Sequence, residues 1–503
     1  MVETRTSRNH FDVLIVGAGL SGIGAACHLS RKCPDQSFAI IERRQRMGGT
    51  WDLFRYPGVR SDSDMYTLGY NFRPWTEPKV LADGPSIREY IVDTADEYGV
   101  ADKIRYGRRM LSGNFDSGNH LWTVETELEE TGEKETFTCR FLLCCTGYYN
   151  YDAGYTPDFP GVADFKGQVV HPQQWPDDLD YSGKKVVVIG SGATAVTLVP
   201  AMAPQADHVT MLQRSPTYIA TVPERDELSV KLRRYLPEMA VYRLARARNI
   251  GFQRFIFKLS RKKPKMVRRA LLSAARRQLE GSVDMKHFTP RYNPWDERLC
   301  AVPDGDLFKV LREGQASIVT DQIETFTENG LRLQSGEELE ADIVITATGL
   351  DLQLLGGAAL SVDGEARKPH DVLVYKGVML RDVPNMAIVF GYTNASWTLK
   401  ADIAAEYVCR LLNLMARKGV QQVVPRDREG CDTEKSFLDL QSGYIQRAAG
   451  RMPRQGNKAP WKVLSNYLYD LPRLRYGAIE DDTLEFSGEA SRRRRGLATI
   501  LRG

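Results

Sequence analysis

The segment Phe11-Asp-Val-Leu-Ile-Val-Gly17-Ala-Gly19-Leu-Ser21-Gly22 decides the fold of this 503-residue chain. Its apolar run leads into a Gly-x-Gly-x-x-Gly turn, and residues 23–30 continue as a helix-like stretch. Gly17 permits the turn, Gly19 lets backbone N–H groups approach a pyrophosphate, and Gly22 lets the helix pack closely on the strand. This succession of strand, turn and helix predicts an α/β dinucleotide-binding domain.

The next apolar run ends in an acid that narrows the choice of ligand. Phe38-Ala-Ile-Ile41 is followed by Glu42, 25 positions after Gly17. A carboxylate at this place can hold the 2′-hydroxyl of a ribose and would repel a 2′-phosphate. The first nucleotide is therefore expected to be FAD or NAD, and not NADP.

A second fingerprint lies further along the chain. The run Lys184-Lys-Val-Val-Val-Ile189 leads into Gly190-Ser-Gly192-Ala-Thr-Ala195, in which alanine replaces the third glycine. The following strand, residues 209–213, ends at Arg214 where an acid would select NAD, and a guanidinium suits the 2′-phosphate of NADP(H). A solvated charge at a strand end is the alternative interpretation of Arg214. The expected fold class is α/β, with two Rossmann-like dinucleotide-binding domains, for FAD and NADP, and a helical insertion.

Two strands end in Thr-Gly, within residues 141–147 and 342–349, and the second resembles a crossing back to the FAD-binding domain, so we expect that domain to be discontinuous. We expect its first part at residues 1–155, an NADP-binding domain at 156–340, and its second part with a C-terminal tail at 341–503. A basic helical insertion at about 224–285 falls inside the NADP-binding domain.

The insertion has an unusual charge. Residues 231–280 carry sixteen Lys or Arg against Glu238 and Glu280, a net charge of +14 in a chain whose net charge is +4. We expect helices there, interrupted at Pro237 and Pro264. A solvated face that covers a substrate cleft is the simpler interpretation, and a basic amphipathic surface for anionic lipid is the second. A non-catalytic nucleic-acid or membrane binder is a hypothesis of a different class, and we expect no nucleic-acid partner.

Composition narrows the remaining classes of protein. The chain has no apolar run of the roughly 18 residues that span a membrane, and its polar start lacks the apolar core of a signal peptide. We therefore expect a cytoplasmic protein, with peripheral association at the inner face of the cell membrane as an option. Eight cysteines show neither metal-ligand spacing nor a Cys-x-x-Cys pair, which argues against a metal site and against a disulfide reductase.

Between the fingerprints lies Phe165-Lys-Gly167-Gln-Val-Val-His171-Pro-Gln-Gln-Trp175-Pro176. Its spacing, F-x-G-x-x-x-H-x-x-x-W-P, resembles the fingerprint of type I Baeyer-Villiger monooxygenases. Met47-Gly-Gly-Thr50-Trp51 and Arg55-Tyr-Pro-Gly58-Val-Arg60-Ser-Asp62 resemble the flavin-side loop of that family, which indicates FAD in the first site. Asn293-Pro-Trp-Asp-Glu-Arg298-Leu-Cys300 and Gly391-Tyr-Thr-Asn-Ala-Ser-Trp397 look most like the branch that includes the mycobacterial ethionamide-activating FAD-containing monooxygenase.

The resemblance implies an FAD-dependent monooxygenase that consumes NADPH and O2. NADPH reduces the flavin, the reduced flavin captures O2 as a C4a-peroxyflavin, and one oxygen atom enters a lipophilic ketone to give an ester or lactone. The branch also implies sulfoxidation of thioethers or thiocarbonyls, and a flavin monooxygenase restricted to S- and N-oxygenation is the alternative. Better-known ketone-oxidising branches place Lys before the catalytic arginine, where this chain has Glu297, so the substrate class stays open.

The motifs and the resemblance together supply the candidate site residues. Arg298 is the candidate for stabilising the peroxide and the tetrahedral intermediate, because a guanidinium stays charged and offers fixed donors, and Asp62 would orient it. The residues expected to bind FAD are Gly17, Gly19, Ser21, Gly22, Glu42, Gly49, Thr50, Trp51, Arg60, Ser61, Asp62, Met110 and Gly147. Those expected to bind NADP(H) or to join the two domains are His171, Trp175, Ile189, Gly190, Ser191, Gly192, Ala193, Thr194, Ala195, Gln213 and Arg214.

Overall fold

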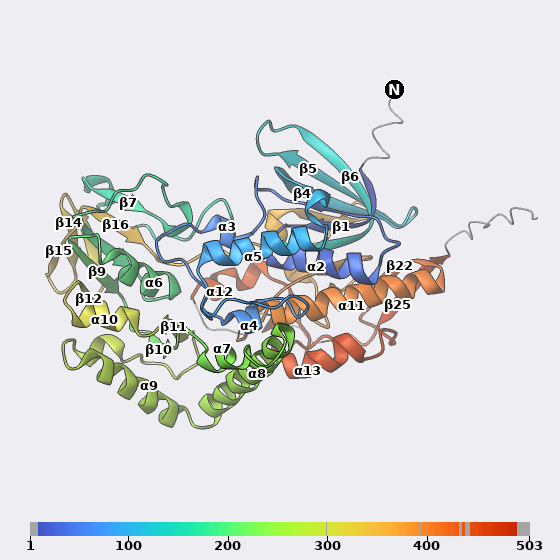
Figure 1. Cartoon of the computed structure of the whole chain (residues 1–503). Coiled ribbons are helices and arrows are strands. Elements are labelled where there is room, and N and C mark those ends of the chain that lie inside the picture. The colour runs from blue at the N-terminus through green and yellow to red at the C-terminus, as the bar shows by residue number, and fades with distance from the viewer. Residues whose placement is uncertain (1–8, 298, 393, 432–434, 438–442, 490–503) are drawn as a thin grey trace, which may run out of the picture.

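The computed structural model describes residues 9–297, 299–392, 394–431, 435–437 and 443–489. Two sheets form the cores of two lobes, and a group of helices lies along one side of both (Figure 1). The expected α/β fold with two dinucleotide-binding units is confirmed.

The first lobe, called the flavin lobe below, contains a nine-stranded sheet with the order β18-β17-β4-β5-β6-β1-β2-β3, to which β21 is added beside β6. The strands are β1 (His10–Val16), β2 (Phe38–Ile41), β3 (Ile104–Arg105), β4 (Arg108–Asp116), β5 (Leu121–Leu128), β6 (Lys134–Cys144), β17 (Ala359–Val362), β18 (Glu365–Ala366) and β21 (Met386–Ile388). β1 pairs in parallel with β2 and β6. Since β17, β18 and β21 follow the second sheet in the sequence, this lobe takes strands from both ends of the chain.

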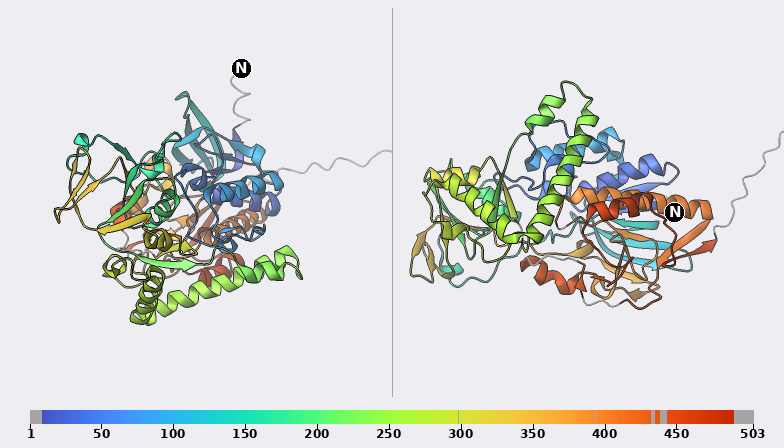
Figure 2. Two further views of the ribbon diagram at one scale, coloured as in Figure 1. Left: turned by 60° about the vertical axis from the view of Figure 1, so that its left-hand side comes forward. Right: turned by 90° about the horizontal axis from the view of Figure 1, so that it is seen from below.

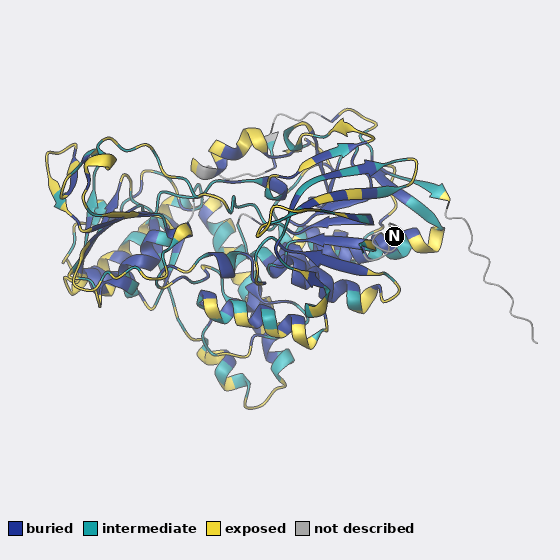
Figure 3. Cartoon of the chain, turned by 90° about the horizontal axis from the view of Figure 1, so that it is seen from above, coloured by how far each residue is buried: buried dark blue, intermediate teal, exposed yellow. Residues whose placement is uncertain are grey.

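Three helices cover one face of this sheet: α2 (Leu20–Lys32), α5 (Gly84–Glu97) and α11 (Trp397–Lys418) (Figure 1). β2 is apolar throughout and wholly buried, as expected of a parallel strand whose two faces are both covered. Figure 3 shows buried residues, in dark blue, concentrated in the central strands and in the helices against them. The remaining elements of this lobe are α3 (Thr50–Leu53), α4 (Met65–Leu68), β19 (Val374–Tyr375), β20 (Met379–Leu380), β22 (Val420–Pro425), β23 (Lys435–Ser436), α12 (Gly443–Ala448), β24 (Arg454–Gln455), α13 (Tyr467–Leu471) and β25 (Leu484–Glu489).

The second lobe, called the nucleotide lobe, contains a five-stranded parallel sheet with the order β12-β9-β8-β16-β7. The strands are β7 (Gln168–Val170), β8 (Lys185–Ile189), β9 (His208–Gln213), β12 (Ala316–Thr320) and β16 (Ile343–Thr346), with helices α6 (Ala193–Met202) and α10 (Asp306–Arg312). An antiparallel unit follows, made of β13 (Ile323–Thr327), β14 (Gly330–Leu333) and β15 (Glu338–Glu340). A separate parallel pair, β10 (Tyr218–Val222) and β11 (Leu299–Pro303), flanks the insertion.

The insertion consists of α7 (Glu227–Leu232), α8 (Glu238–Lys262) and α9 (Pro264–Leu279). Pro237 lies directly before α8 and Pro264 is the first residue of α9, so both prolines stand where the sequence predicts a helix break. Figure 2 shows α8 extending from the nucleotide lobe along the flavin lobe.

Candidate active site

A cavity of about 1100 Å³ opens between the two lobes and the insertion. Its wall combines the first glycine turn, the loop around residues 54–64, the start of α6, the β10–β11 pair and the facing sides of α8 and α9. Of the residues predicted for the site, those that line it are Gly17, Gly19, Ser21, Glu42, Gly49, Thr50, Trp51, Arg60, Ser61, Asp62, Met110, Gly147, Ala193 and Thr194. Residues of both fingerprints therefore line the same cavity.

The first glycine turn has the close contacts that its sequence requires. Gly17 has φ +102°, and a Cβ on Gly22 would lie 1.8 Å from the Gly17 carbonyl oxygen. A Cβ on Gly19 would lie 3.3 Å from Cα of Gly49, so Gly19 fits tightly against the second glycine loop. The N-terminus of α2 carries no side-chain cap. This cradle of glycines and backbone N–H groups, which no side chain caps, fits a pyrophosphate.

Glu42 follows the last residue of β2 and lies beside the cradle. It is 4% exposed and accepts hydrogen bonds from the backbone N–H groups of Ala18, at 2.7 Å, and Arg44, at 2.8 Å. Burial raises the pKa of its carboxyl. The two N–H donors oppose this rise, because they stabilise the charged carboxylate. Since Glu42 also lines the cavity, its remaining acceptor capacity is available to ribose hydroxyls.

The second glycine turn differs from the first in one respect. A Cβ on Gly190, at φ +144°, would lie 2.4 Å from the Ala347 carbonyl oxygen, whereas a Cβ on Gly192 would meet nothing within 4 Å. The protein itself therefore does not require a glycine at position 192. Open space at the uncapped N-terminus of α6 fits a second pyrophosphate.

The end of β9 places two candidate residues in different environments. Gln213 is the last residue of the strand and Arg214 follows it. Arg214 is exposed, as a partner of a 2′-phosphate must be before binding. Gln213 is 1% exposed and its Nε2 donates to the His287 carbonyl, at 2.7 Å, and to Thr320 Oγ1, at 2.9 Å. Its side chain therefore supports the strand end from inside the lobe.

His171 lies at the joint between the lobes and not in the cavity wall. Its Nδ1 accepts from the Gln173 N–H at 3.1 Å, so Nε2 carries the proton that it donates to the Gly349 carbonyl at 3.3 Å. A Cβ on Gly154 would lie 1.9 Å from the ring. Burial lowers the pKa of His171, which keeps the ring neutral. His171 therefore links two segments, around 154 and 349, where the chain crosses between the lobes. Trp175 packs at the edge of the core of the nucleotide lobe.

The loop that leads to Asp62 is attached to the nucleotide lobe. Arg60 forms an ion pair with Asp306, with Nη1 and Oδ2 2.7 Å apart, and a Cβ on Gly58 would lie 2.6 Å from Cβ of Ala201 in α6. Burial raises the pKa of Tyr56 to about 12, and its hydroxyl bonds to Thr194. The flavin-side loop is thereby held against the second fingerprint.

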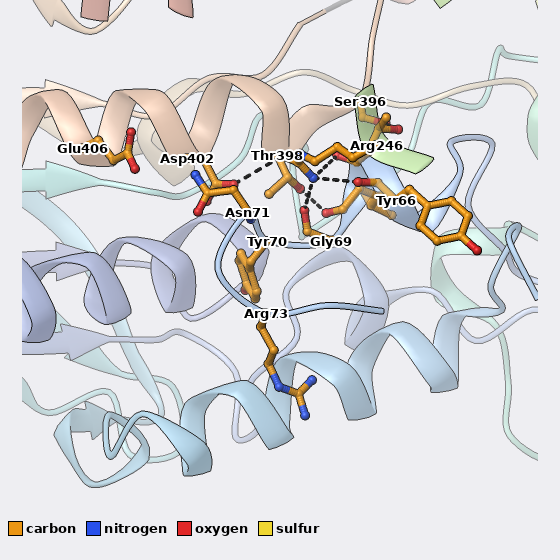
Figure 4. Close-up of polar contacts among 12 residues, drawn as sticks. Tyr66, Gly69, Tyr70, Asn71, Arg73, Arg246, Ser396, Thr398, Asp402 and Glu406 are labelled. Atoms are coloured by element: carbon orange, nitrogen blue, oxygen red, sulfur yellow. Dashed lines mark hydrogen bonds and ion pairs between the residues drawn. The ribbon is translucent and has the colours of Figure 1, made fainter. Parts of the chain in front are cut away.

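Buried polar contacts attach the insertion to the flavin lobe. Arg246 of α8 is 7% exposed, and its Nη1 donates to the carbonyls of Tyr66, at 2.7 Å, and Gly69, at 2.8 Å (Figure 4). Its Nη2 lies 3.5 Å from Asp402 Oδ2, on α11. A buried guanidinium with several acceptors is costly to disturb, so α8 is a fixed wall of the site.

The sequence does not identify a second attachment, at the edge of the cavity. Asp64 accepts from Asn249 Nδ2 at 2.8 Å and from Gln253 Nε2 at 2.9 Å. All three residues line the cavity. The four-residue spacing of the two amides on one side of α8 is the only sequence signal for this contact.

Arg298 lies outside the described residues. Its sequence neighbours Glu297 and Leu299 both line the cavity. Burial raises the pKa of the Glu297 carboxyl, an effect that the positive charge of Arg214 opposes.

Comparison with known proteins identifies the family. The model of the family described as "Flavin-binding monooxygenase-like" matches residues 78–389, and that of the "NAD(P)-binding Rossmann-like domain" matches residues 15–76. The chain belongs to the flavin-binding monooxygenase-like family. It is 59% identical to the FAD-containing monooxygenase MymA of Mycobacterium tuberculosis, over 96% of this chain and 98% of that protein. It is 52% identical to the FAD-containing monooxygenase EthA of the same species, over 95% and 98%.

Solved structures agree on the fold. An oxidised steroid monooxygenase bound to NADP matches with a TM-score of 0.76 at 20% identity, covering 95% of this chain and 99% of that chain. The family membership confirms the expected enzyme class, an NADPH-dependent flavin monooxygenase, and with it the expected cofactors FAD and NADPH. The resemblance to the EthA branch is also confirmed.

Three further observations bear on the other expectations. All eight cysteines are free and buried. In the described part of the chain, no cluster of three or more His, Cys, Asp or Glu residues is arranged to hold a metal ion. Every helix of the described residues is too short or too polar to cross a membrane.

Proposed function

We propose that this monooxygenase inserts one oxygen atom from O2 into lipophilic ketones, giving esters or lactones, and also oxidises thioethers or thiocarbonyls. The observation that supports this proposal is that residues of both fingerprints, Gly17 and Gly19 of the first and Ala193 and Thr194 of the second, line one cavity, and that one part of its wall is apolar. Eight apolar residues of α8 and α9 contribute to that part: Phe252, Ile256, Leu259, Met266, Val267, Ala270, Leu271 and Ala274. Such a wall favours an uncharged, lipophilic substrate and excludes water from it.

Different residues of the chain hold the two cofactors and stabilise the charge that develops during oxygen transfer. The bound flavin, once reduced by NADPH, supplies the activation of O2. Gly19 and Glu42 place the flavin nucleotide, and Gly192 with Arg214 places NADPH. Asp62, which lines the cavity, orients Arg298, whose guanidinium stabilises negative charge that develops on oxygen during transfer.

A product analysis tests this proposal. NADPH and O2 consumption is measured across matched ketones and thioethers, and each product is identified. Esters or lactones formed in proportion to NADPH support the proposal. Sulfoxides with no ester or lactone from any ketone would favour the alternative, a flavin monooxygenase restricted to S- and N-oxygenation.

We expect Arg214→Ala to weaken the preference for NADPH over NADH. A charge-assisted contact to the 2′-phosphate is worth about ten- to a hundredfold in affinity, and NADH lacks that phosphate. The apparent KM for NADPH should rise by this factor while that for NADH stays nearly unchanged. Arg332→Ala, which removes an exposed arginine of β14 that pairs with Glu338, is the control and should change neither. Equal losses with both cofactors would contradict the assignment.

The insertion supports a second proposal, peripheral association with anionic lipid. Apolar side chains stand exposed among its many basic residues; they include Tyr235, Leu244, Phe252, Phe255 and Met266. Phe252 is 63% exposed and also lines the cavity, so the cavity reaches the surface on this side of α8. A membrane held there would deliver lipophilic substrates directly.

We expect the protein to sediment with vesicles of anionic lipid at low salt and to be released at high salt, since the attraction is largely electrostatic. Neutral vesicles should retain much less protein. Replacing Phe252 and Phe255 by Ser should reduce sedimentation without changing the charge. Protein that stays in the supernatant with anionic vesicles at low salt would leave the insertion as a solvated cover of the cleft.

A further inference from the structure

Trp295 adopts a backbone conformation that its residue type disfavours. The Asp296 N–H donates to the Asn293 carbonyl at 3.0 Å, which closes a β-turn with Pro294 and Trp295 at its centre. Trp295 has φ +67°. Proline in the second position and a positive φ in the third define a type II turn, whose third residue is ordinarily Gly or Asn. A bulky residue there is strained, and such strain persists only where the surroundings impose it.

Two contacts hold this turn against the insertion. Asp296 accepts from the Asn293 N–H and side-chain amide, each at 3.2 Å, and its Oδ1 lies 2.6 Å from Nη1 of Arg261 at the end of α8. The Trp295 ring meets Phe257 of α8 edge to face, with centroids 6.5 Å apart. The contacts of Asp296 do not involve the Trp295 side chain, so they remain when that side chain is replaced.

The indole is not part of a closed core. Trp295 is half-buried and lines the cavity together with the apolar residues of α8 and α9. Core packing alone thus does not account for a tryptophan at a position suited to glycine. Because Trp295 lines the same cavity as these apolar residues, its ring is available to an apolar group of a substrate.

We propose that Trp295 is a specificity-determining residue whose ring packs on the hydrocarbon part of the substrate. This inference rests on the proposed function, because it assumes that the apolar part of the cavity receives the substrate. An aromatic wall selects for long or bulky apolar groups, since it rewards the apolar surface that they bury.

Trp295→Gly tests the proposal because it removes the ring and relieves the backbone strain together. We expect the Tm to stay within about 3 °C of the parent, since strain relief offsets the lost contact with Phe257. The KM for a long-chain ketone should rise about tenfold or more, as losses of apolar contact in a pocket do. The KM values for a short ketone and for NADPH should be unchanged.

Two further variants sharpen the result. Trp295→Phe keeps an aromatic ring and the same strain, so it should retain most of the affinity for the long ketone. Tyr476→Ala, at an aromatic position that is 74% exposed and does not line the cavity, should leave every KM unchanged.

Binding is also read from the rise in Tm caused by saturating ketone or thioether, which does not depend on the product formed. This readout separates a failure of the inference from a failure of the proposed reaction. A fall in Tm of more than about 5 °C in Trp295→Gly, with equal losses of affinity for long and short substrates, would show that Trp295 supports the fold and does not select the substrate. Unchanged binding of the long substrate, or a loss confined to NADPH, would also overturn the proposal.

Discussion

The Gly19→Val protein is expected to purify without flavin and to have no NADPH-dependent activity. A Cβ at this position would lie 3.3 Å from Cα of Gly49, so the second glycine loop has to shift by a few tenths of an ångström, and the two added methyl groups would occupy the cradle at the N-terminus of α2. The fold should survive because no backbone atom has to move far. The measurement is the visible absorbance of the purified protein together with its thermal unfolding. A yellow, fully loaded protein would show that the first fingerprint does not hold the flavin.

Gly192→Val is the matched control for the second fingerprint. Because a Cβ there meets nothing within 4 Å, the substitution should leave the fold and the flavin intact. The yellow protein should be reduced by dithionite but only slowly by NADPH. Loss of flavin from this variant would contradict the division of the cavity into two nucleotide sites.

Arg298→Ala is expected to lower product formation by about 10² to 10³, the usual cost of removing a preorganised group that stabilises developing charge. Flavin binding and the slow oxidation of NADPH should remain, with hydrogen peroxide released in place of oxygenated product. Asp62→Ala should impair the same step more mildly. The double variant should be little worse than Arg298→Ala, because the two residues act as a unit.

The coupling ratio, product formed per NADPH consumed, measures this effect. If Arg298→Ala keeps near-normal coupling, another cationic side chain must stabilise the developing negative charge. Arg60 would be a poor substitute, because both of its terminal nitrogens already face the Asp306 carboxylate. Arg291, which stands seven positions before Arg298 in the sequence, would then be the next residue to replace.

The two glycine turns and Glu42 could be predicted from the sequence because their geometry is local. A strand, a tight turn and a helix determine where Gly17 and Gly22 must approach each other, and Glu42 follows at the end of the adjacent strand. The breaks at Pro237 and Pro264 are local in the same sense, since proline cannot continue a helix from its interior.

The attachment of the insertion could not be predicted, because its partners are far away in the sequence. Arg246 reaches carbonyl groups near residue 66, and Asn249 reaches Asp64, 185 positions away. Nothing in the pattern of α8 distinguishes Arg246, which is buried, from its many solvated neighbours. The strain at Trp295 is likewise invisible in a sequence, since a positive φ is ordinarily assigned to glycine or asparagine.

The most direct test of the account is the fate of isotopically labelled O2 in the oxidation of a lipophilic cyclic ketone with NADPH. The account predicts a lactone that carries one labelled oxygen atom in its ring, formed in a one-to-one ratio with NADPH. Unchanged ketone accompanied by labelled hydrogen peroxide, while thioethers under the same conditions yield labelled sulfoxides, would contradict it.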